Sequence, residues 1–492
     1  MWKIMKSLDK WSVVESYYDM YSPVQQQINS FNQFVDEKVS DIVEENGFIS
    51  SNNNVDVTLS NVEITNPQIV EADRTAKFRL MPMEARLRNL TYSGSIYLDI
   101  KLYRKGVLQD EKRAYVGEMP ILVKSNRCNL YGMTAEELME NGEDPMDRGG
   151  YLIVNGSEKA LITQEVLAFD RILLNETEEV INAQVISVKG AFKGKVRITR
   201  TADGLLTVTF PSSPRKLYLV ELLNAIGFLK PNQIMDLFPN DQTIQNEVLL
   251  NLDKIELQSE EEALDKIGRS VAPSQTKNYR LRRAKEVIDS FLLPHLGQEA
   301  EARTMKAHFM VAMSVKIMEK AYNLRKQADK DHYANKRLEL SGKLMENLFR
   351  FSFKHFTKDL KFQIDRTISR HRKLNINTVI RPDAITERIL FAVSTGNWIG
   401  QLTGVSKYMS RDNYITPVTD LRKVKSTLDS SRELYEARDV HGTHWGRLCP
   451  VETPDGPNCG LVKNLAMMAK ITTDSDTENI KRMLKAEDVT TE

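Results

Sequence analysis

The chain has 492 residues, of which 41% are hydrophobic and 27% charged, a composition typical of a globular protein of two to four domains. Its 68 Lys and Arg residues nearly balance its 67 Asp and Glu residues, and this net charge of +1 argues against a free-standing DNA-binding protein, which would be more basic. Three cysteines argue against a disulfide framework, and the absence of a signal-peptide core or of a membrane-length apolar run predicts a cytoplasmic protein that has no membrane partner.

The N-terminal part of the chain shows helical and then strand-like patterns. Apolar spacing predicts helix up to Val43, and the run SSNNN at Ser50–Asn54 predicts a loop. From Val55 the pattern becomes strand-like, most clearly over residues 96–103, where apolar and polar side chains alternate. A short strand is expected again at Tyr151–Val154, directly before the hairpin turn that Asn155-Gly156 favours.

The sequence pattern in the middle of the chain predicts strands and then helices. Residues 177–230 are strand-rich, and an acidic helix near Glu260–Asp265 and a basic one at Tyr279–Lys285 have the pattern of solvated helix faces. Over residues 296–375 an apolar side chain recurs every four residues, which predicts one long helix or two abutting helices with a packed stripe. This region ends in a basic cluster of Arg366, Arg370, His371, Arg372 and Lys373. Cations suit the last turn of a helix, so the cluster alone says little about nucleic acid.

After Leu390 the chain becomes rich in glycine and proline, and few regular elements are expected there. Four aromatic residues argue against disorder: Trp398, Tyr408, Tyr414 and Trp445. Long irregular segments of this kind are usually functional.

Common catalytic signatures are missing from the sequence. It has no GxxxxGK[ST], GxGxxG, HExxH or GxSxG motif and no carboxylate pair in a context suited to two magnesium ions. If the protein takes part in phosphoryl transfer, the metal is therefore held by another chain. Four residues could in principle bind zinc: His441, His444, Cys449 and Cys459. Their spacing is not that of a zinc finger, so two packed thiols and two hydrogen-bonded histidines are preferred, and no zinc is expected.

Residues 404–463 could instead contact nucleic acid, because cations are interleaved with aromatic rings there. The cations are Lys407, Arg411, Arg422, Lys423, Lys425, Arg432, Arg438, Arg447 and Lys463. Phosphates need cations, and guanidinium groups also bond base edges. With a net charge near zero, either the chain binds no nucleic acid or it binds through such local patches inside a larger assembly.

One segment carries a specific family resemblance. Ala437–Ala469 reads ARDVHGTHWGRLCPVETPDGPNCGLVKNLAMMA and closely resembles the fork of the second-largest subunit of multisubunit RNA polymerases. Further segments resemble the same subunit in the same order: PMEARLRNLTYSG at Pro82–Gly94, GEMPILVKSNRCNL at Gly117–Leu130, GGYLIVNGSEKALITQE at Gly149–Glu165, DHYANKRLEL at Asp331–Leu340, and STGNW and GVSKYMSRDN after them. The resemblance spans essentially the whole chain, and the motifs are closer in sequence to the archaeal and eukaryotic form of the subunit than to the bacterial form.

The resemblance implies an α+β multidomain fold. It places a protrusion domain at 20–175 and 328–390, a lobe domain inserted at 176–327, an irregular, loop-rich fork at 391–470 and a C-terminal tail at 471–492. Only about two dozen residues follow the fork segment, which resembles the split form of the subunit found in some archaea.

The resemblance implies a subunit of DNA-directed RNA polymerase, a nucleotidyltransferase active only in the assembled complex. The chain would shape the DNA/RNA cleft beside the active site, with no catalytic residue of its own. The Mg²⁺ ions would be bound by the largest subunit. The implied partners are the C-terminal half of the same subunit, the largest and other polymerase subunits, the template and non-template DNA strands and nascent RNA.

The resemblance also implies individual site residues. Those expected near the nucleotide insertion site are Arg447, Asp455 and Asn458. Those expected to face DNA or RNA are Lys159, Gln164, Asp331, Lys336, Arg337, Arg422, Lys423 and Arg432. For Asp455 the alternative is a turn in which the carboxylate bonds its own backbone. For the whole chain the alternatives are a non-enzymatic nucleic-acid-binding or scaffold protein derived from such a subunit, and a zinc-dependent hydrolase.

Overall fold

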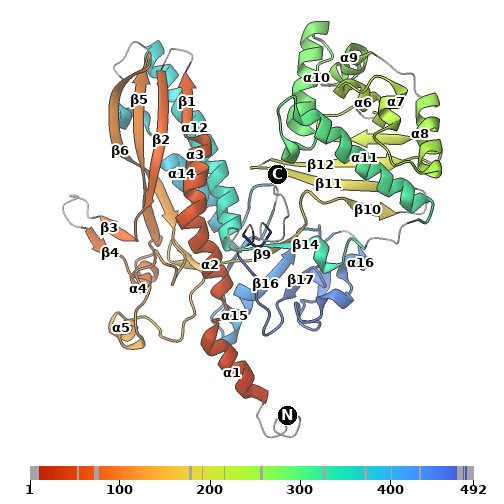
Figure 1. The fold of residues 1–492 in the computed structure, drawn as a ribbon. Coiled ribbons are helices and arrows are strands. Elements are labelled where there is room, and N and C mark those ends of the chain that lie inside the picture. Colours follow the sequence, from red (N-terminus) through yellow and green to blue (C-terminus); the bar gives the residue numbers. More distant parts are fainter. Residues whose placement is uncertain are drawn as a thin grey trace. The chain divides into compact units, whose positions relative to one another are not determined.

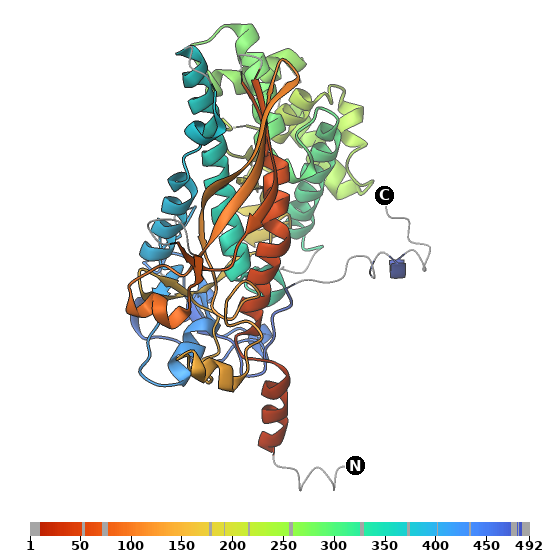
Figure 2. The same cartoon turned by 90° about the vertical axis from the view of Figure 1, so that its left-hand side faces the viewer.

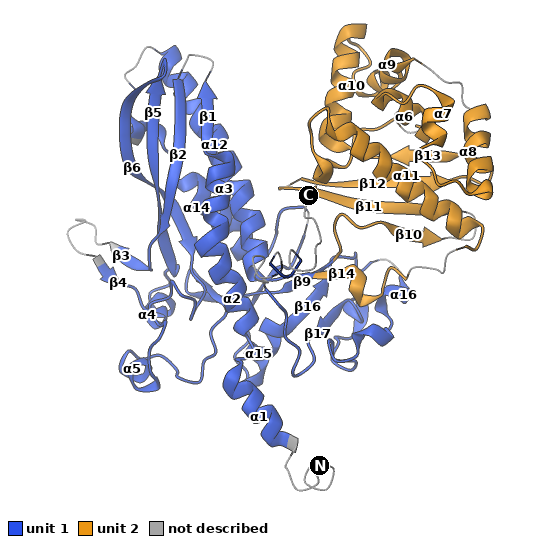
Figure 3. Cartoon of the chain, viewed as in Figure 1, with its two compact units in different colours: residues 1–166, 338–492 blue, residues 167–337 orange. Residues whose placement is uncertain are grey.

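The structure is a computed structural model that describes residues 10–473, 480 and 482–484, apart from 52–54, 71–76, 177–179, 191, 215–216, 255–258, 325–328, 371–373, 401 and 432–433. The chain forms two compact units (Figures 1 and 3). Unit 1 comprises residues 1–166 and 338–492, and unit 2 comprises residues 167–337. Each unit combines helices with a sheet, so the predicted α+β class is confirmed.

Unit 1 is built from two stretches of chain that flank unit 2 in the sequence. The first stretch contains α1 (Lys10–Met20), α2 (Gln25–Gln33), the π-helix η1 (Phe34–Lys38), α3 (Val39–Asn46), β1 (Phe48–Ser51), β2 (Val55–Ile64), β3 (Gln68–Val70), β4 (Lys77–Arg79), α4 (Pro82–Leu87), β5 (Ser93–Arg104), β6 (Val107–Pro120), α5 (Ala135–Glu140), β7 (Leu152–Val154), β8 (Ser157–Leu161) and β9 (Thr163–Leu167). The second contains β14 (Lys336–Glu339), α12 (Ser341–Ser369), α13 (Ile376–Val379), α14 (Asp383–Thr395), β15 (Ser406–Tyr408), α15 (Ile415–Arg422), β16 (Lys423–Ser426), α16 (Tyr435–Arg438), η4 (Gly442–His444), η5 (Gly456–Asn458) and β17 (Val462–Asn464).

The long antiparallel sheet of unit 1 has the strand order β1-β2-β5-β6, and the helices α2, α3 and α12 run beside it (Figures 1 and 2). Ile96, Leu98 and Ile100 of β5 are buried and alternate with half-buried neighbours, as the period-two pattern predicted. On α12, the stripe that repeats every four residues is buried from Leu344 to Ile364, which confirms the predicted long helix.

Unit 2 packs helices against one antiparallel sheet of order β10-β11-β12-β13. Its elements are β10 (Leu173–Glu176), β11 (Ile181–Lys189), β12 (Phe192–Arg200), β13 (Leu206–Thr209), α6 (Leu219–Ile226), α7 (Pro231–Met235), α8 (Gln242–Lys254), α9 (Glu260–Val271), α10 (Lys277–Phe291), η2 (Pro294–Leu296), α11 (Ala302–Ala321) and η3 (Tyr333–Asn335). Within the unit β10 pairs with β11, and near its two ends the Ala168 amide donates to the Asn335 carbonyl at 2.8 Å. The lobe bounds 176–327 stay a prediction.

Two local predictions need correction. Ser50 and Ser51 belong to β1 instead of a loop, because they pair with residues of β2, and the rest of that predicted loop lies outside the described residues. Asp265 in the acidic run is not solvated, because it is buried and binds Arg269 and Arg280 at 2.8 Å each. Within the described part of the chain, every helix is too short or too polar to serve as a membrane span.

Candidate functional site

Three short strands of residues 391–470, the segment predicted to be the fork and called the fork below, are built into sheets with residues 157–167, which follow the Asn155-Gly156 turn. β15 pairs antiparallel with β8, which sets Lys407 opposite Ala160. β16 pairs parallel with β9 and antiparallel with β17, so Val424 lies between Thr163 and Lys463. The backbone of the fork is therefore fixed by residues more than two hundred positions away in the sequence.

A buried ion pair joins β9 and β17, the two strands on either side of β16. The Lys463 ammonium lies 3.0 and 2.8 Å from the two carboxylate oxygens of Glu165, and both residues are less than a tenth exposed. A pair of this kind is costly to break, because the surviving charge stays buried without a partner.

A second buried carboxylate holds the turn between α15 and β16. Asp420 is fully buried, and one of its oxygens lies 2.6 Å from the Lys423 ammonium and 3.2 Å from that of Lys407. Burial disfavours ionisation of this carboxyl, but the hydrogen bonds and charges of the two lysines outweigh it and lower the pKa of Asp420 below its usual value. The predicted DNA-facing residue Lys423 thus has an intramolecular partner.

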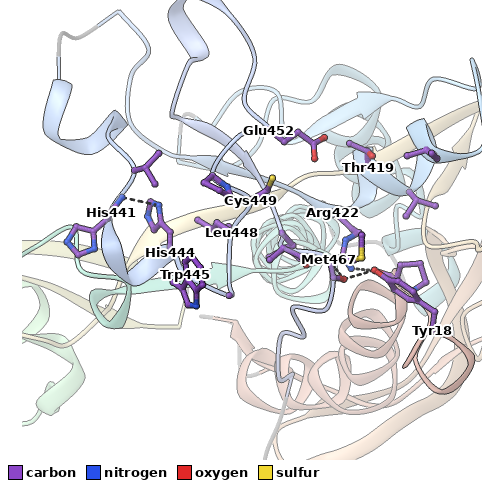
Figure 4. A pocket seen from close by; sticks show the side chains of 18 of the residues that line it. Tyr18, Thr419, Arg422, His441, His444, Trp445, Leu448, Cys449, Glu452 and Met467 are labelled. Carbon is purple, nitrogen blue, oxygen red and sulfur yellow. Dashed lines mark hydrogen bonds between the residues drawn. The ribbon is translucent and has the colours of Figure 1, made fainter. Parts of the chain in front are cut away.

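Arg422 ties the fork to the N-terminal part of the chain. Its guanidinium donates to the carbonyls of Pro23 at 2.9 Å, Ala466 at 2.6 Å and Met467 at 3.1 Å, and burial lowers its pKa. The Tyr18 hydroxyl donates to the same Met467 carbonyl at 2.5 Å, as Figure 4 shows. The buried guanidinium therefore fastens the segment after β17 to the end of α1.

Two arginines surround the buried ring of Tyr151. Arg411 binds Glu158 and Asp147 at 2.7 and 2.9 Å, and Arg86 binds Glu158 at 2.7 Å. Their guanidinium carbons lie 5.1 and 5.9 Å from the centre of the Tyr151 ring. This network links the loop after β15 to β8 and α4, so Arg411 has a structural role beside any contact with phosphate.

The loop from Trp445 to Cys459 is held at its base and exposed at its tip. Arg438 donates to the carbonyls of Pro457 and Cys459 at 2.6 and 2.9 Å. Trp445 is 89% exposed and Val451 is 83% exposed, so these side chains are available to a partner. The geometry suits a rigid surface that carries exposed side chains.

The three residues predicted near the insertion site share this exposed region. Arg447, Asp455 and Asn458 are all exposed, and the Arg447 guanidinium donates to the Thr443 carbonyl at 3.1 Å. Asp455 precedes η5, and its side chain makes no capping hydrogen bond, so the alternative of a self-bonded turn is not observed. The structure thus presents the three side chains outward.

A cavity of about 980 Å³ lies at the base of the fork, and its lining is mainly apolar (Figure 4). Trp445, Leu448 and Met467 line it from the fork, and Tyr18 and Ile415 line it from α1 and α15.

Lys159 and Gln164, two of the residues predicted to face DNA or RNA, are buried. The Lys159 ammonium lies 3.3 Å from the centre of the Tyr408 ring and donates to the Ser394 carbonyl at 2.9 Å. The Gln164 amide donates to the Ile162 carbonyl at 2.8 Å. Nucleic-acid contact by Lys159, Gln164 and Arg422 stays a prediction, and the chain itself uses all three to hold its backbone.

The remaining predicted residues lie in unit 2 or outside the described chain. Lys336 pairs with Asp331 at 3.1 Å, and Arg337 is exposed and donates to the carbonyls of Ala334 and Lys336. Arg432 lies outside the described residues. Lys336 and Arg337 begin β14, which belongs to the sheet of order β14-β9-β16-β17 and therefore to the same sheet as the strand that Lys423 begins.

The histidine and cysteine set shows hydrogen bonding among its histidines. The His441 Nδ1 accepts from the Thr443 amide at 3.1 Å, and the His444 Nδ1 accepts from the His441 amide at 3.4 Å, which confirms the expected hydrogen-bonded histidines. Cys459 is exposed, so the expectation of two packed thiols is wrong for this residue. Among the described residues, no group of three or more His, Cys, Asp or Glu side chains could hold a metal ion.

Sequence reasoning missed the acidic partners in this site. Glu165 and Asp420 hold the lysines that the composition suggested for phosphate, and the buried Gln27 donates to the Thr163 hydroxyl at 2.9 Å and the Leu421 carbonyl at 3.2 Å. One signal was present: Glu165 is followed directly by Val166 and Leu167 in a strand-like run. A charge in such a run indicates a buried pair, although it does not name the partner.

Comparison with known families gives two matches along the chain. The family model described as "RNA polymerase beta subunit" matches residues 22–387, and the one described as "RNA polymerase Rpb2, domain 3" matches residues 407–471. The second match includes β16, β17 and all of β15 except its first residue, Ser406.

Individual relatives agree with these matches. A protein named "DNA-directed RNA polymerase subunit Rpo2N" from Methanococcus vannielii is 40% identical over 490 residues, which is 96% of this chain and 97% of the relative. The protein of the same name from Methanocaldococcus jannaschii is 40% identical over 491 residues, and the match covers 98% of that relative. "DNA-directed RNA polymerase subunit Rpo2" from Saccharolobus solfataricus is 41% identical over 469 residues, but the chain spans only 42% of that longer relative.

Proposed function

This chain belongs to the RNA polymerase beta subunit family, and from that premise we propose that it acts as the N-terminal part of the second-largest subunit of an archaeal DNA-directed RNA polymerase. The observation that carries the proposal is the end-to-end identity of 40% with relatives named Rpo2N. The enzyme is a nucleotidyltransferase, and its other subunits, DNA and RNA are the partners of this chain.

The contribution of the chain to catalysis is positioning. Arg447, Asp455 and Asn458 project from a loop whose base is fixed by Arg438, by the Glu165–Lys463 pair and by the β16–β17 ladder. Such a surface can hold a nucleotide and the growing RNA end in place without reorganising during the reaction. Mg²⁺ would be held by the largest subunit and would stabilise the charge that develops on the transferred phosphate.

The domain roles follow the resemblance. Unit 2 would be the lobe, the β1-β2-β5-β6 sheet with its helices the protrusion, and residues 391–470 the fork. The C-terminal half of the subunit would be a separate polypeptide, a proposal supported by the relatives named Rpo2N, which this chain matches over nearly their full length.

The nucleic-acid-facing role is proposed for two classes of residue. Arg337 is exposed and Arg432 lies outside the described part, and both would contact phosphate directly. The other six residues have partners within the chain, and their first role is to fix the backbone that carries the exposed cations. They are Asp331, Lys336, Lys423, Lys159, Gln164 and Arg422. The scaffold alternative is not favoured, because the relatives are named as polymerase subunits.

The proposal is tested by purifying the chain with an affinity tag from its native host and identifying the co-purifying polypeptides by mass. We expect the largest subunit and a polypeptide matching the remainder of the longer relatives, together with template-directed RNA synthesis in the presence of Mg²⁺ and nucleotides. The recombinant chain alone is expected to be inactive. RNA synthesis by the chain alone, or recovery of the tagged chain without polymerase subunits, would contradict the proposal.

A further inference from the structure

The outward side of α12 carries aromatic rings and lysines in one row. Phe351, Lys354, Lys358 and Phe362 are spaced by three or four positions, so they share one side of the helix. The opposite side, which includes Phe353 and Phe356, is buried in the core of unit 1. The row extends for about 16 Å along the helix axis.

The neighbouring helix α14 extends this surface. α12 and α14 pack side by side, and α14 exposes Arg388 and Phe391, which lie one turn apart. His355 on α12 stacks edge-on against Phe351 at 4.5 Å between ring centres. Burial and the charges of Arg388, Lys358 and Lys354 lower the pKa of His355, so cations from both helices surround this point. We call Phe351, Lys354, Lys358, Phe362, Arg388 and Phe391 the α12–α14 face.

The α12–α14 face has exposed rings, and its cations form no ion pair with a carboxylate among the described residues. Phe362 is 61% exposed and Phe391 is 63% exposed, and Phe351 is 38% exposed. In the described part of the chain no carboxylate forms an ion pair with Lys354, Lys358 or Arg388, whereas other lysines and arginines of α12 do pair, as Lys343 does with Glu346. Exposed rings beside unpaired cations are unusual on a surface that contacts only water.

We propose that the α12–α14 face binds single-stranded nucleic acid, independently of its sequence. Unpaired bases would stack on the phenylalanine rings, and the lysines and Arg388 would contact the phosphates between them. A duplex hides the faces of its bases, so the three exposed rings favour a single strand over a duplex. The cations that end α12, Arg366 and Arg370, continue the positive charge beyond Phe362.

This inference goes beyond the proposed function, because the α12–α14 face lies outside the loop that carries Arg447, Asp455 and Asn458. It concerns the chain alone and is measured without polymerase activity. Its failure would leave the subunit assignment intact, and failure of that assignment would leave this binding measurable.

The test measures the fluorescence anisotropy of a labelled oligothymidine of about 12 nucleotides as the purified full chain is added, over a range of salt concentrations. The wild-type chain is expected to bind the single strand more tightly than a duplex of equal length. Phe362→Ala is expected to weaken binding at least fivefold, the loss of one stacked base, whereas Phe78→Ala removes an equally exposed ring elsewhere and is expected to have no effect.

A second pair of variants tests how much the lysine charges contribute to binding. Lys354→Ala/Lys358→Ala is expected to weaken binding and to reduce its salt dependence, while Lys105→Ala/Lys112→Ala removes the same charge from the exposed β5–β6 hairpin and is expected to change neither. Ultraviolet crosslinking of the wild-type chain is expected to label peptides of α12 and α14. The proposal is overturned if each variant binds like its control, if duplex binds as tightly as single strand, if an acidic peptide binds in place of the oligonucleotide, or if the crosslinks fall outside α12 and α14.

Discussion

Removal of the Lys463 ammonium provides a sharp test of how the fork is held. In Lys463→Met the Glu165 carboxylate would remain buried, at 3% exposure, but would lose the ammonium group that lies 2.8 Å from it. Loss of one member of a buried pair costs about 3–5 kcal/mol of stability. In the double variant Lys463→Met/Glu165→Met both charges are replaced by apolar side chains of similar volume, and most of that loss is expected to be recovered.

The assay is hydrogen exchange of backbone amides, followed by mass spectrometry of peptides from the purified chain. The ladders that open when the pair is lost are β9 with β16 and β16 with β17, so peptides covering 163–167, 423–426 and 462–464 are followed. The single variant is expected to accelerate their exchange by about a hundredfold or more. The strands β11 and β12 of unit 2 serve as an internal control and are expected to exchange at the wild-type rate.

Two results would refute this reasoning. One is a single variant whose fork peptides exchange within a few-fold of the wild type. The other is a double variant that is as unstable as the single variant, because the harm would then come from lost packing of the lysine stem and not from an unpaired charge. Lys112→Met, at an exposed position of β6, controls for the substitution itself.

Three further predictions concern the fork. Asp455→Asn keeps the shape of an exposed side chain but removes its charge, so the polymerase is expected to assemble normally and to change its elongation rate or fidelity; unchanged transcription would remove the electrostatic role. Gly456 and Gly460 both have positive φ, but of the two only a Cβ at Gly460 would meet backbone, at the Arg438 carbonyl. Gly456→Ala is therefore expected to cost about 1 kcal/mol and Gly460→Ala clearly more, measured by proteolysis of the loop. Folding lowers the pKa of Asp420, so the ionised carboxylate stabilises the folded chain fully at pH values above its unfolded pKa of about 3.9. This stabilisation is lost as the pH falls through the lower pKa of the folded state. Asp420→Asn is expected to remove this part of the acid sensitivity of thermal unfolding.

Local periodicity was sufficient to predict the elements whose burial pattern is regular. The alternation of Ile96, Leu98 and Ile100 gave β5, and the four-residue repeat from Leu344 to Ile364 gave α12. In both cases one side of the element faces a continuous core, so the burial leaves a repeating signature in the sequence.

Pairing between distant strands leaves no such signature. The contact of β8 with β15 and of β9 with β16 depends on tertiary packing, and the Glu165–Lys463 pair spans 298 positions. The composition of residues 404–463 therefore suggested phosphate contacts for lysines that the fold uses internally. A single sequence cannot separate a solvated cation from one that is buried with an acid, because the acid lies elsewhere in the chain.

In the proposed function the exposed fork loop stands beside the nucleotide insertion site of the assembled enzyme. A photo-crosslinking amino acid placed at position 458 of the tagged polymerase, halted with a radiolabelled RNA 3′ end, tests this placement. We expect crosslinks from position 458 to the RNA 3′ end or the incoming nucleotide, and none from position 105 on the β5–β6 hairpin. Crosslinks that form equally from both positions, or an absence of crosslinks from position 458 in an actively elongating complex, would contradict it.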